Sequence, residues 1–345
     1  MRAKLEDVCV RGSSNLKQSD VIDKTGEYPI YGAAGYIGNV DFYYQDQPYV
    51  AVVKDGAGIG RTSLYPAKSS VIGTMQYLLP KENVLPEYLC YVVKYMHLEK
   101  YFTGATIPHI YFKDYKKEEF NLDTLDRQKE IVNILGRIES VISSRQQELQ
   151  KLDELIKARF VEMFGHETNS NKWDIVKVED VADVQVGVVI KPSQYYTNQN
   201  NGIRAFRSLN IGAGYIKDTD WVYFTEEGHQ KNAKSILKEN DLIIVRSGTP
   251  GTACVVTKEY AGCNAIDIII AHPNCKKVNP FYLCAFTNMP HGKKQIDEGI
   301  GGAAQQHFNV GKYNKVRLML PPMELQKEFE IFVHQVDKSK LKKLR

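Results

Sequence analysis

The second half of the chain repeats the first. When residues 103–141 are placed over residues 301–339, an ungapped offset of 198 residues, identical side chains recur along the whole stretch. The matches are Gly104 with Gly302, Ala105 with Ala303, His109 with His307, Tyr115 with Tyr313, Lys117 with Lys315, Leu122 with Leu320 and the triplet 128–130 with 326–328. Composition alone does not explain a run of this length, so we expect two copies of one structural unit.

Weaker matches lie upstream in the same order. Residues 6–8 match 179–181, residues 54–56 correspond to 246–248, and the motif Pro-x-Tyr-Leu-Cys begins at both Pro86 and Pro280. The offset grows from 173 to 192, 194 and 198 residues, so the second copy carries insertions between shared framework elements. Such insertions are typical of variable loops on one scaffold.

A long helix is predicted between the two copies. From Leu125 to Phe164 apolar residues recur at helical spacing, without proline and with Gly136 as the one glycine. A helix of this length extends about 60 Å, longer than a small domain is wide, so its apolar seam needs a partner helix. The seam residues are Ile131, Ile134, Leu135, Ile138, Val141, Ile142, Leu149, Leu152 and Ile156.

The end of the second copy supplies a partner helix. After Pro321 and Pro322 the pattern continues with Phe329, Phe332 and Val336. This helix is expected to be truncated, because it stops roughly 15 to 20 residues short of the first. We therefore predict an α+β fold with two pseudo-repeated globular domains joined by long helices that pair as an antiparallel coiled coil. The predicted boundaries are 1–122 and 172–320 for the globular domains and 123–171 and 321–345 for the helices.

Shorter patterns predict the elements inside each copy. Buried strands are expected at Tyr49–Lys54, Asp241–Arg246 and Ala265–Ala271, and short helices at Glu87–Tyr101 and Phe281–Asn288.

Composition excludes several classes of protein. The 345 residues include 45 basic, 41 acidic and 43% hydrophobic side chains, which fits neither a disordered nor a fibrous chain. No apolar run reaches the ~18 residues of a membrane span, and Met1–Val10 lacks the apolar core of a signal peptide, so we expect a cytoplasmic protein without a membrane partner. With a net charge of only +4, nucleic-acid binding would require clustered cationic side chains or help from partners.

No metal or cofactor is expected. The six cysteines contain no Cys-x-x-Cys pair and are predicted to be reduced and mostly buried. The spacing of Cys263, His272, Cys275 and Cys284 matches no common zinc pattern, so four core residues is the better interpretation.

Two motifs resemble enzyme sites without their full patterns. Asp55–Arg61 is rich in glycine but lacks the Gly-Lys-Ser/Thr ending and a following helix, which favours a tight turn between two strands over a nucleotide cradle. Asn279–Tyr282 mimics the Asn-Pro-Pro-Tyr/Phe motif of adenine methyltransferases. The first copy has Leu85–Tyr88 there, so the shared proline and tyrosine are assigned to helix initiation and packing. We expect no catalytic residues.

Polar clusters are candidates for DNA contacts. Arginine suits guanine or phosphate, and asparagine and glutamine suit adenine edges. Each of these residues, taken singly, is explained as part of a solvated surface. For His109 and His307 a role in a structural turn is an equal alternative. Taken together, the clusters favour DNA contact. The candidates are Tyr31, Lys54, Asp55, Gly56, Arg61 and His109 in the first copy, and Arg204, Arg207, Ser208, Asn210, Arg246, Ser247, Thr249, Gln305, Gln306, His307 and Asn309 in the second.

Four motifs occur in a characteristic order: the glycine-rich stretch 54–61, its counterpart 246–251, the helix entries 125–131 and 323–329, and the helix ending 158–165. With the duplication, this layout resembles the DNA specificity (S) subunits of Type I restriction-modification systems over the full chain. The resemblance implies two target recognition domains that each read one half of a split double-stranded DNA site. It also implies spacer helices that dock DNA methyltransferase (M) subunits, two in number, with restriction (R) subunits as further partners, and no active site in the S subunit itself.

Two alternatives remain. One is an enzyme with its own nucleotide or S-adenosylmethionine site, such as a fused DNA methyltransferase, which nucleotide binding would reveal. The other is a coiled-coil adaptor that does not bind DNA, for which no salt-dependent DNA affinity is expected.

Overall fold

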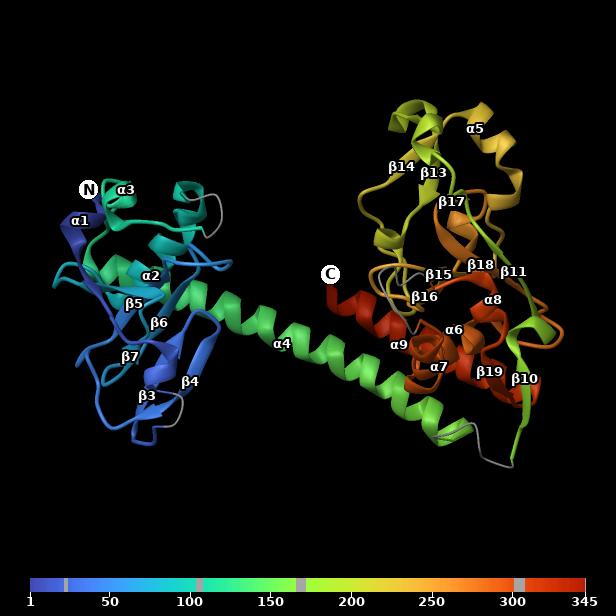
Figure 1. Ribbon diagram of the computed structural model, residues 1–345, viewed down its shortest axis with the longest axis horizontal. Coiled ribbons are helices and arrows are strands. Elements are labelled where there is room, and N and C mark those ends of the chain that lie inside the picture. Colours follow the sequence, from blue (N-terminus) through green and yellow to red (C-terminus); the bar gives the residue numbers. More distant parts are fainter. Residues whose placement is uncertain (22–23, 104–107, 166–171, 301–307, 345) are drawn as a thin grey trace. The chain divides into compact units, whose positions relative to one another are not determined.

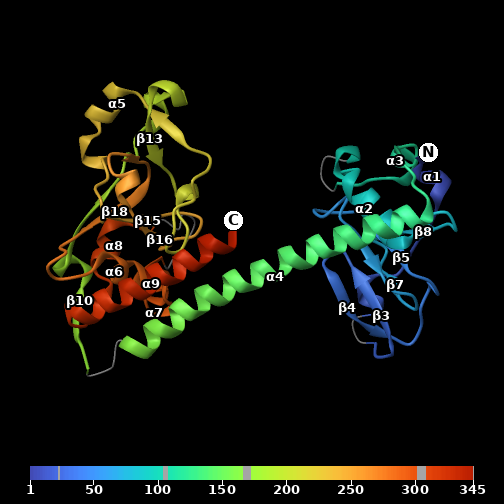
Figure 2. The ribbon, with the colours of Figure 1, turned by 180° about the vertical axis from the view of Figure 1, so that it is seen from behind.

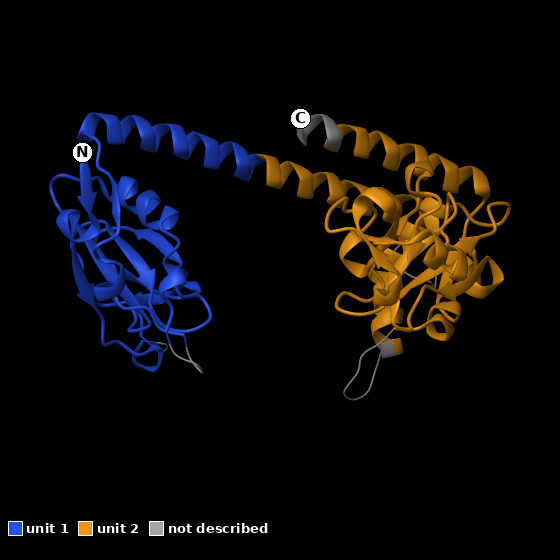
Figure 3. Ribbon diagram, turned by 90° about the horizontal axis from the view of Figure 1, so that it is seen from above, with its two compact units in different colours: residues 1–144 blue, residues 145–345 orange. Residues whose placement is uncertain are grey.

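The structure is a computed structural model that describes residues 1–21, 24–103, 108–165, 172–300 and 308–344. The chain divides into two compact units, unit 1 (Met1–Ser144) and unit 2 (Arg145–Arg345), shown in two colours in Figure 3. The boundary falls within α4 (Leu125–Phe164), a helix with the predicted bounds. Among the described residues, no helix is both long and apolar enough to cross a membrane.

Unit 1 contains a central antiparallel sheet and a smaller second sheet (Figure 1). The central sheet has the order β2 (Cys9–Ser13), β8 (Met75–Pro80), β5 (Tyr49–Val53), β6 (Thr62–Tyr65). The second sheet has the order β4 (Gly35–Val40), β3 (Tyr28–Gly32), β7 (Ser70–Val71), with β3 and β7 parallel. The other elements are β1 (Arg2–Lys4) paired with β9 (Glu119–Asn121), α1 (Leu5–Val8), α2 (Pro86–Tyr95) and α3 (Phe112–Tyr115).

Unit 2 repeats this strand order. Its central sheet is β11 (Ala182–Val186), β18 (Ile268–Pro273), β15 (Leu242–Val245), β16 (Ala253–Val255). Its second sheet is β12 (Tyr196–Thr197), β14 (Val222–Phe224), β13 (Ile203–Phe206), β17 (Asn264–Ala265), again with one parallel pair, β13 with β17. The other elements are β10 (Asp174–Lys177) paired with β19 (Arg317–Leu320), α5 (Glu226–Lys231), α6 (Pro280–Asn288), α7 (Pro290–Ile300), α8 (Val310–Asn314) and α9 (Met323–Leu344). The predicted α+β fold with a duplicated module is confirmed.

The central strands are buried on both faces. In β5, Val50 and Val52 pack into the core that contains α2, whereas Tyr49, Ala51 and Val53 pack on the opposite face toward the second sheet. All five side chains are at most 1% exposed. Burial on both sides explains why these strands are continuous apolar runs in the sequence without polar alternation.

The repeated glutamines connect the long helices to the globular parts. In unit 1 the fully buried Gln128 accepts a hydrogen bond from Leu85 N at 2.8 Å and donates to the carbonyls of Asn83 and Asp123. In unit 2 the fully buried Gln326 accepts from Asn279 N at 2.8 Å and donates to Pro321 O. Each glutamine therefore fixes the start of α2 or α6 against the start of a long helix.

Helix α9 packs antiparallel to the C-terminal part of α4 within unit 2 (Figures 1 and 2). Ion pairs join Arg159 to Glu328 at 2.8 Å and Asp153 to Lys340 at 2.7 Å. Residue numbers therefore increase along one helix in the direction in which they decrease along the other. Next to the ion pair of Arg159 with Glu328, the rings of Phe160, Phe164 and Phe329 pack together with Tyr282. This packing confirms the antiparallel pairing for the end of the seam.

The remaining seam residues have different surroundings. Ile156 packs into the core of unit 2 with the buried Phe329, Val336 is 5% exposed, and Ile131 packs against the core of unit 1. Leu135, Leu149, Leu152 and Phe332 are half-buried. The apolar side chains that are about half exposed are Ile134, Ile138, Val141 and Ile142. As expected for the shorter second helix, α9 has 22 residues whereas α4 has 40, so the pairing covers only part of the seam.

Three local predictions were wrong. The stretch 265–271 forms two strands, because Asp267 adopts a left-handed φ of 48° and redirects the chain. The helix expected to reach Tyr101 ends at Tyr95, since His97 has a φ of 52°. Cys275 is exposed whereas the other five cysteines are buried, so it is not a core residue.

Candidate nucleic-acid interface

A glycine turn connects β5 to β6 in unit 1. Gly60 N donates to Val53 O and Val53 N donates to Arg61 O, both at 2.9 Å, while Gly56 and Gly60 have φ values of 92° and 80°. This is the predicted tight turn between two antiparallel strands. No helix follows it directly, so it lacks the helix N-terminus that holds phosphate in glycine-rich nucleotide loops.

Four candidate residues of unit 1 meet at this turn. Asp55 Oδ1 lies 2.7 Å from His109 Nδ1, and Lys54 pairs with the other oxygen of the same carboxylate. Main-chain bonds fix the two segments together, with Ile110 N donating to Lys54 O at 2.9 Å and Gly56 N donating to Pro108 O at 3.0 Å. The turn therefore presents an ammonium, a carboxylate and an imidazole from one rigid site.

Arg61 and Tyr31 lie on the neighbouring surface. Arg61 is exposed and donates from Nη1 to Ala33 O at 3.0 Å, next to β3. Tyr31 stacks on Tyr65 with ring centroids 3.8 Å apart, and burial raises the pKa of the Tyr31 hydroxyl, which stays protonated. A shallow pocket of about 470 Å³ adjoins the turn and is lined by Arg61, Lys94 and Glu99.

Unit 2 has the same turn with different side chains. Gly251 N donates to Val245 O and Val245 N donates to Thr252 O, both at 2.9 Å, and Phe308 N donates to Arg246 O at 3.1 Å. These bonds match those of unit 1, with Arg246 in the place of Lys54. The Arg246 guanidinium donates to Phe308 O and pairs with Asp267, which leaves its side chain 16% exposed. Ser247 and the exposed Thr249 follow in the turn.

A second cationic group of unit 2 lies on its second sheet. Arg204, on β13, lies 3.8 Å from Asp218 and places its guanidinium 5.5 Å from the ring centroid of Trp221 and 5.8 Å from that of Tyr260. Aromatic stacking holds this arginine in one orientation while its side chain stays 40% exposed. The arrangement suits contact with a phosphate or a guanine edge.

The next candidates along the chain have a structural role. Asn210 is fully buried, accepts a hydrogen bond from Arg207 N at 2.9 Å and donates to Thr219 O at 2.6 Å. Arg207 donates to the carbonyl of Asp220. Asn210 therefore holds the loop together and we no longer place it in the interface, whereas Ser208 is half-buried at the loop surface.

The candidates before α8 are only partly described. Gln305, Gln306 and His307 lie outside the described residues. Asn309 is the N-cap of α8, where its side-chain oxygen accepts a hydrogen bond from Lys312 N at 3.0 Å. The role of this amide oxygen is thus helix capping.

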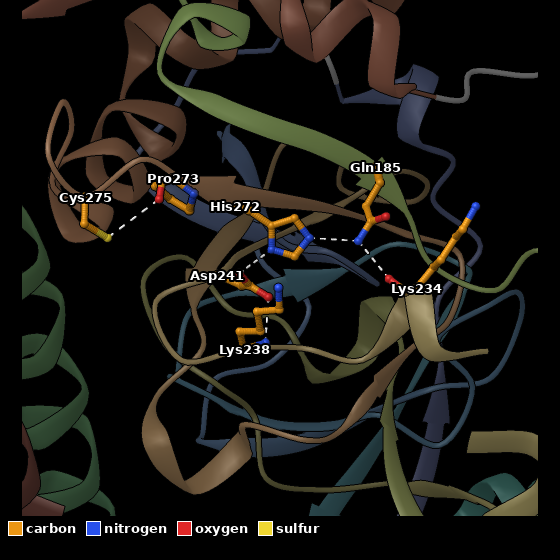
Figure 4. Close-up of polar contacts among 7 residues, drawn as sticks. All are labelled: Gln185, Lys234, Lys238, Asp241, His272, Pro273 and Cys275. Carbon is orange, nitrogen blue, oxygen red and sulfur yellow. Dashed lines mark hydrogen bonds and ion pairs between the residues drawn. The ribbon is translucent and has the colours of Figure 1, made fainter. Parts of the chain in front are cut away.

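Two of the four residues considered for zinc, His272 and Cys275, have separate contacts in the structure (Figure 4). His272 Nδ1 lies 2.5 Å from Asp241 Oδ1, and its Nε2 faces the amide nitrogen of Gln185 at 2.8 Å. The same Gln185 nitrogen also donates to Lys234 O, so His272 lies in a chain of polar contacts between Asp241 and Gln185. The Cys275 sulfur instead points at Pro273 O at 3.6 Å. Among the described residues, no three His, Cys, Asp or Glu side chains form a metal-binding group.

Asn279 also has a structural role. Its side-chain oxygen accepts hydrogen bonds from Phe281 N and Tyr282 N and caps α6, while its amide donates to Glu330 at 2.7 Å. The Tyr282 hydroxyl donates to Met319 O, as the Tyr88 hydroxyl of unit 1 donates to Asn121 O, each at 2.8 Å. The methyltransferase-like motif is thus part of the framework, as the repeat predicted.

Two residues that contact the turn of unit 2 were missed from the sequence. Asp267 pairs with Arg246, and Lys293 contacts the turn that follows Arg246. Asp267 carries no local signal. Lys293 has an indirect sequence signal. The repeat offset grows from 194 to 198 residues between Pro280 and Gly302, which indicates an insertion in the second copy, and α7 lies in this stretch.

Comparisons with known proteins agree with this architecture. The family model described as Type I restriction modification DNA specificity domain matches residues 1–154 and again residues 170–345. The chain is 23% identical to the Type I restriction enzyme MjaVIII specificity subunit of Methanocaldococcus jannaschii over 310 residues, which cover 84% of this chain and 72% of that protein.

Solved structures share the fold. The S subunit of a Type I restriction-modification system from M. genitalium superposes with a TM-score of 0.60 at 13% identity, covering 99% of this chain and 90% of the other. A chain from a structure of complex assembly and conformational transition in a type I R-M system superposes with a TM-score of 0.51 at 14% identity and the same coverage.

Proposed function

Because the chain belongs to the Type I restriction modification DNA specificity family, we propose that each of its two units reads one half of a bipartite double-stranded DNA target. We assign target recognition domain 1 to residues 1–122 and target recognition domain 2 to residues 172–320. The spacer helices are then 123–171 and 321–345. Action on chromosomal and invading DNA would place the protein in the cytoplasm.

One observation carries this proposal: the same turn occurs in both units with different side chains. The bonds from Ile110 N to Lys54 O and from Phe308 N to Arg246 O are equivalent main-chain contacts of the two turns. Unit 1 presents Lys54, Asp55 and His109 there, whereas unit 2 presents Arg246 and Thr249. One scaffold with two sets of polar side chains is what two different half-sites require.

Helix α4 supports a second role as a docking surface for two methylation subunits, with restriction subunits as further partners. Its half-exposed apolar residues Ile134, Ile138, Val141 and Ile142 lie at helical spacing on one face. Methyl transfer and DNA cleavage would belong to these partners.

The proposal is tested by co-expressing the full chain with its methylation subunit in a methylation-free host and sequencing the methylome. We expect methylation at one bipartite motif. Arg61→Ala should weaken or relax one half of the motif and Arg246→Ala the other, with about 1 to 3 kcal/mol of discrimination lost per bidentate contact.

Arg137→Ala is the matched control, since Arg137 is an exposed arginine of α4. It should leave both halves of the motif unchanged. If Arg61→Ala and Arg246→Ala impair both halves equally, the assignment of one half-site to each unit is wrong. Absence of sequence-specific methylation with the wild-type chain would contradict the recognition role as a whole.

A further inference from the structure

The turn of unit 2 is contacted by a lysine from a neighbouring helix. Lys293 on α7 donates from Nζ to Pro250 O at 3.0 Å and lies 3.3 Å from Thr252 Oγ1. These two acceptors are on either side of Gly251. A single ammonium therefore joins both sides of the bend that follows Arg246, Ser247 and Thr249.

The same face of α7 packs directly on the turn. Ile296, one helical turn after Lys293, is fully buried, and a Cβ placed on Gly251 would lie 2.5 Å from its Cδ1. Gly251 also has a φ of 73°. Glycine is thus required here both for the left-handed backbone and for the close approach of α7.

The surroundings of Lys293 indicate that its ammonium makes specific hydrogen bonds and is not simply exposed to solvent. The side chain is half-buried, and burial lowers the pKa of its ammonium, while the neighbouring Asp297 acts in the opposite direction. Removing an ammonium from water is unfavourable unless hydrogen bonds offset the loss. The contacts with Pro250 O and Thr252 Oγ1 provide that offset.

Unit 1 is built differently at the matching position. A Cβ on Gly60 would lie 2.7 Å from the backbone nitrogen of Glu99, so a helical segment also packs on this turn. Among the described residues of unit 1, however, no lysine from a helix donates to the turn. Lys94 lines the adjoining pocket and lies 3.9 Å from Glu139.

We propose that Lys293 is a positioning residue that holds turn 246–252 in its DNA-reading conformation and so determines how strictly unit 2 reads its half-site. This inference rests on the proposed function. It places the effect of Lys293 on one half of the target only, because Lys293 contacts the turn of unit 2.

The test uses the full-length variant Lys293→Met, which keeps the length and apolar stem of the side chain but removes its donor. Lys294→Met is the matched control, since Lys294 is exposed on the same helix and loses the same charge. Lys293→Arg retains a cationic donor and should restore most of the wild-type behaviour. Two measurements are made: hydrogen exchange of peptides covering 246–252 in the free chain, and the methylome with the methylation subunit.

For Lys293→Met we expect exchange in 246–252 to become about tenfold faster, as loss of charge-assisted hydrogen bonds predicts, with peptides of β5 and β18 unchanged. The methylome should show relaxed bases in the half-site that Arg246→Ala alters, and the Lys294→Met methylome should match the wild type. Unchanged exchange in Lys293→Met would overturn the proposed support of the turn. Faster exchange with an unaltered motif would overturn its role in DNA reading.

The exchange measurement needs neither DNA nor a partner. A wild-type chain that directs no sequence-specific methylation would therefore refute the proposed function, while exchange would still decide whether Lys293 holds the turn.

Discussion

Two buried glutamines, Gln128 and Gln326, make equivalent hydrogen bonds in the two units, and their removal gives a direct test of the framework. Gln128→Ala leaves Leu85 N, Asn83 O and Asp123 O without their partner. We expect the free energy of unfolding of unit 1 to fall by about 3 kcal/mol, because buried polar groups would lose their hydrogen bonds. Urea unfolding measures this change.

The matched control is Gln146→Ala, since Gln146 is an exposed glutamine of the same helix. It should change the free energy of unfolding by less than about 0.5 kcal/mol. Equal effects of the two substitutions would contradict a stabilising role for the buried hydrogen bonds of Gln128.

Tyr88 predicts a decline of stability in alkaline solution. The pKa of Tyr88 is raised from 10.0 to about 12. Burial is the largest cause, and the hydrogen bond from the Tyr88 hydroxyl to the Asp123 carboxylate adds to it. Between these values the unfolded chain loses the proton while the folded protein keeps it, so stability present below pH 10 is lost as pH rises toward 12. Urea unfolding of Tyr88→Phe should show a shallower decline over this interval.

Tyr95→Phe is the control for this measurement, because Tyr95 is 84% exposed. Its stability should follow the wild-type curve from pH 9 to pH 12. A Tyr88→Phe curve parallel to that of the wild type would contradict the assigned ionisation.

At the residue scale, sequence patterns predicted where the glycine turns lie better than they predicted what individual polar side chains do. Gly60 and Gly251 stood out because a glycine-rich turn was recognisable in both copies, and the structure gives each a positive φ. Asn210 belonged to a polar cluster that also fits a DNA surface, yet it is buried. Burial of a polar side chain depends on contacts with distant residues such as Thr219, which local patterns do not encode.

At the scale of elements, the pairing of α4 with α9 depends on an aromatic cluster. Phe329 is fully buried and contacts the rings of Phe160 and Phe164. Phe329→Ala should lower the free energy of unfolding of unit 2 by about 3 to 5 kcal/mol, through lost burial and the cavity left behind. Urea unfolding followed by near-UV circular dichroism would detect it.

Ile331→Ala is the corresponding control, since Ile331 lies on the same helix and is 58% exposed. It should cost less than about 1 kcal/mol. If both variants unfold at the same urea concentration, α9 does not contribute to the core of unit 2.

Long elements were predicted with their bounds, and short ones less well. The apolar period predicted Leu125–Phe164, a helix of 40 residues or about eleven turns, with its observed bounds. The stretch 265–271 has a uniform apolar pattern, yet Asp267 divides it between two sheets. Asp267 pairs there with Arg246, a contact between residues far apart in the sequence that a local pattern does not encode.

At the scale of the whole molecule, α4 belongs in part to each unit. We therefore expect the length of α4 to determine the gap between the two half-sites of the DNA target. Insertion of four residues near Glu148 adds about 6 Å of helix and turns it about 40° beyond one revolution. At about 3.4 Å per base pair, the unspecified gap between the half-sites should grow by one or two base pairs while the bases in each half stay the same.

Methylome sequencing of the insertion variant measures this gap. Insertion of four residues in the loop that contains the exposed Gly262 of unit 2 is the control and should leave the gap unchanged. An unaltered gap in the helix variant, with changed half-site bases, would mean that α4 does not determine the spacing.

The paired main-chain bonds from Ile110 N to Lys54 O and from Phe308 N to Arg246 O have a consequence for the evolution of new targets. Because they join backbone atoms, they do not use the side chains of Lys54 or Arg246, and they require an N–H at residues 110 and 308, which proline would remove. The scaffold can thus tolerate many substitutions of the side chains in the two turns. A library randomised at the displayed positions should keep its folded fraction while its members diverge in target preference, so selection can change what is recognised without first restoring stability.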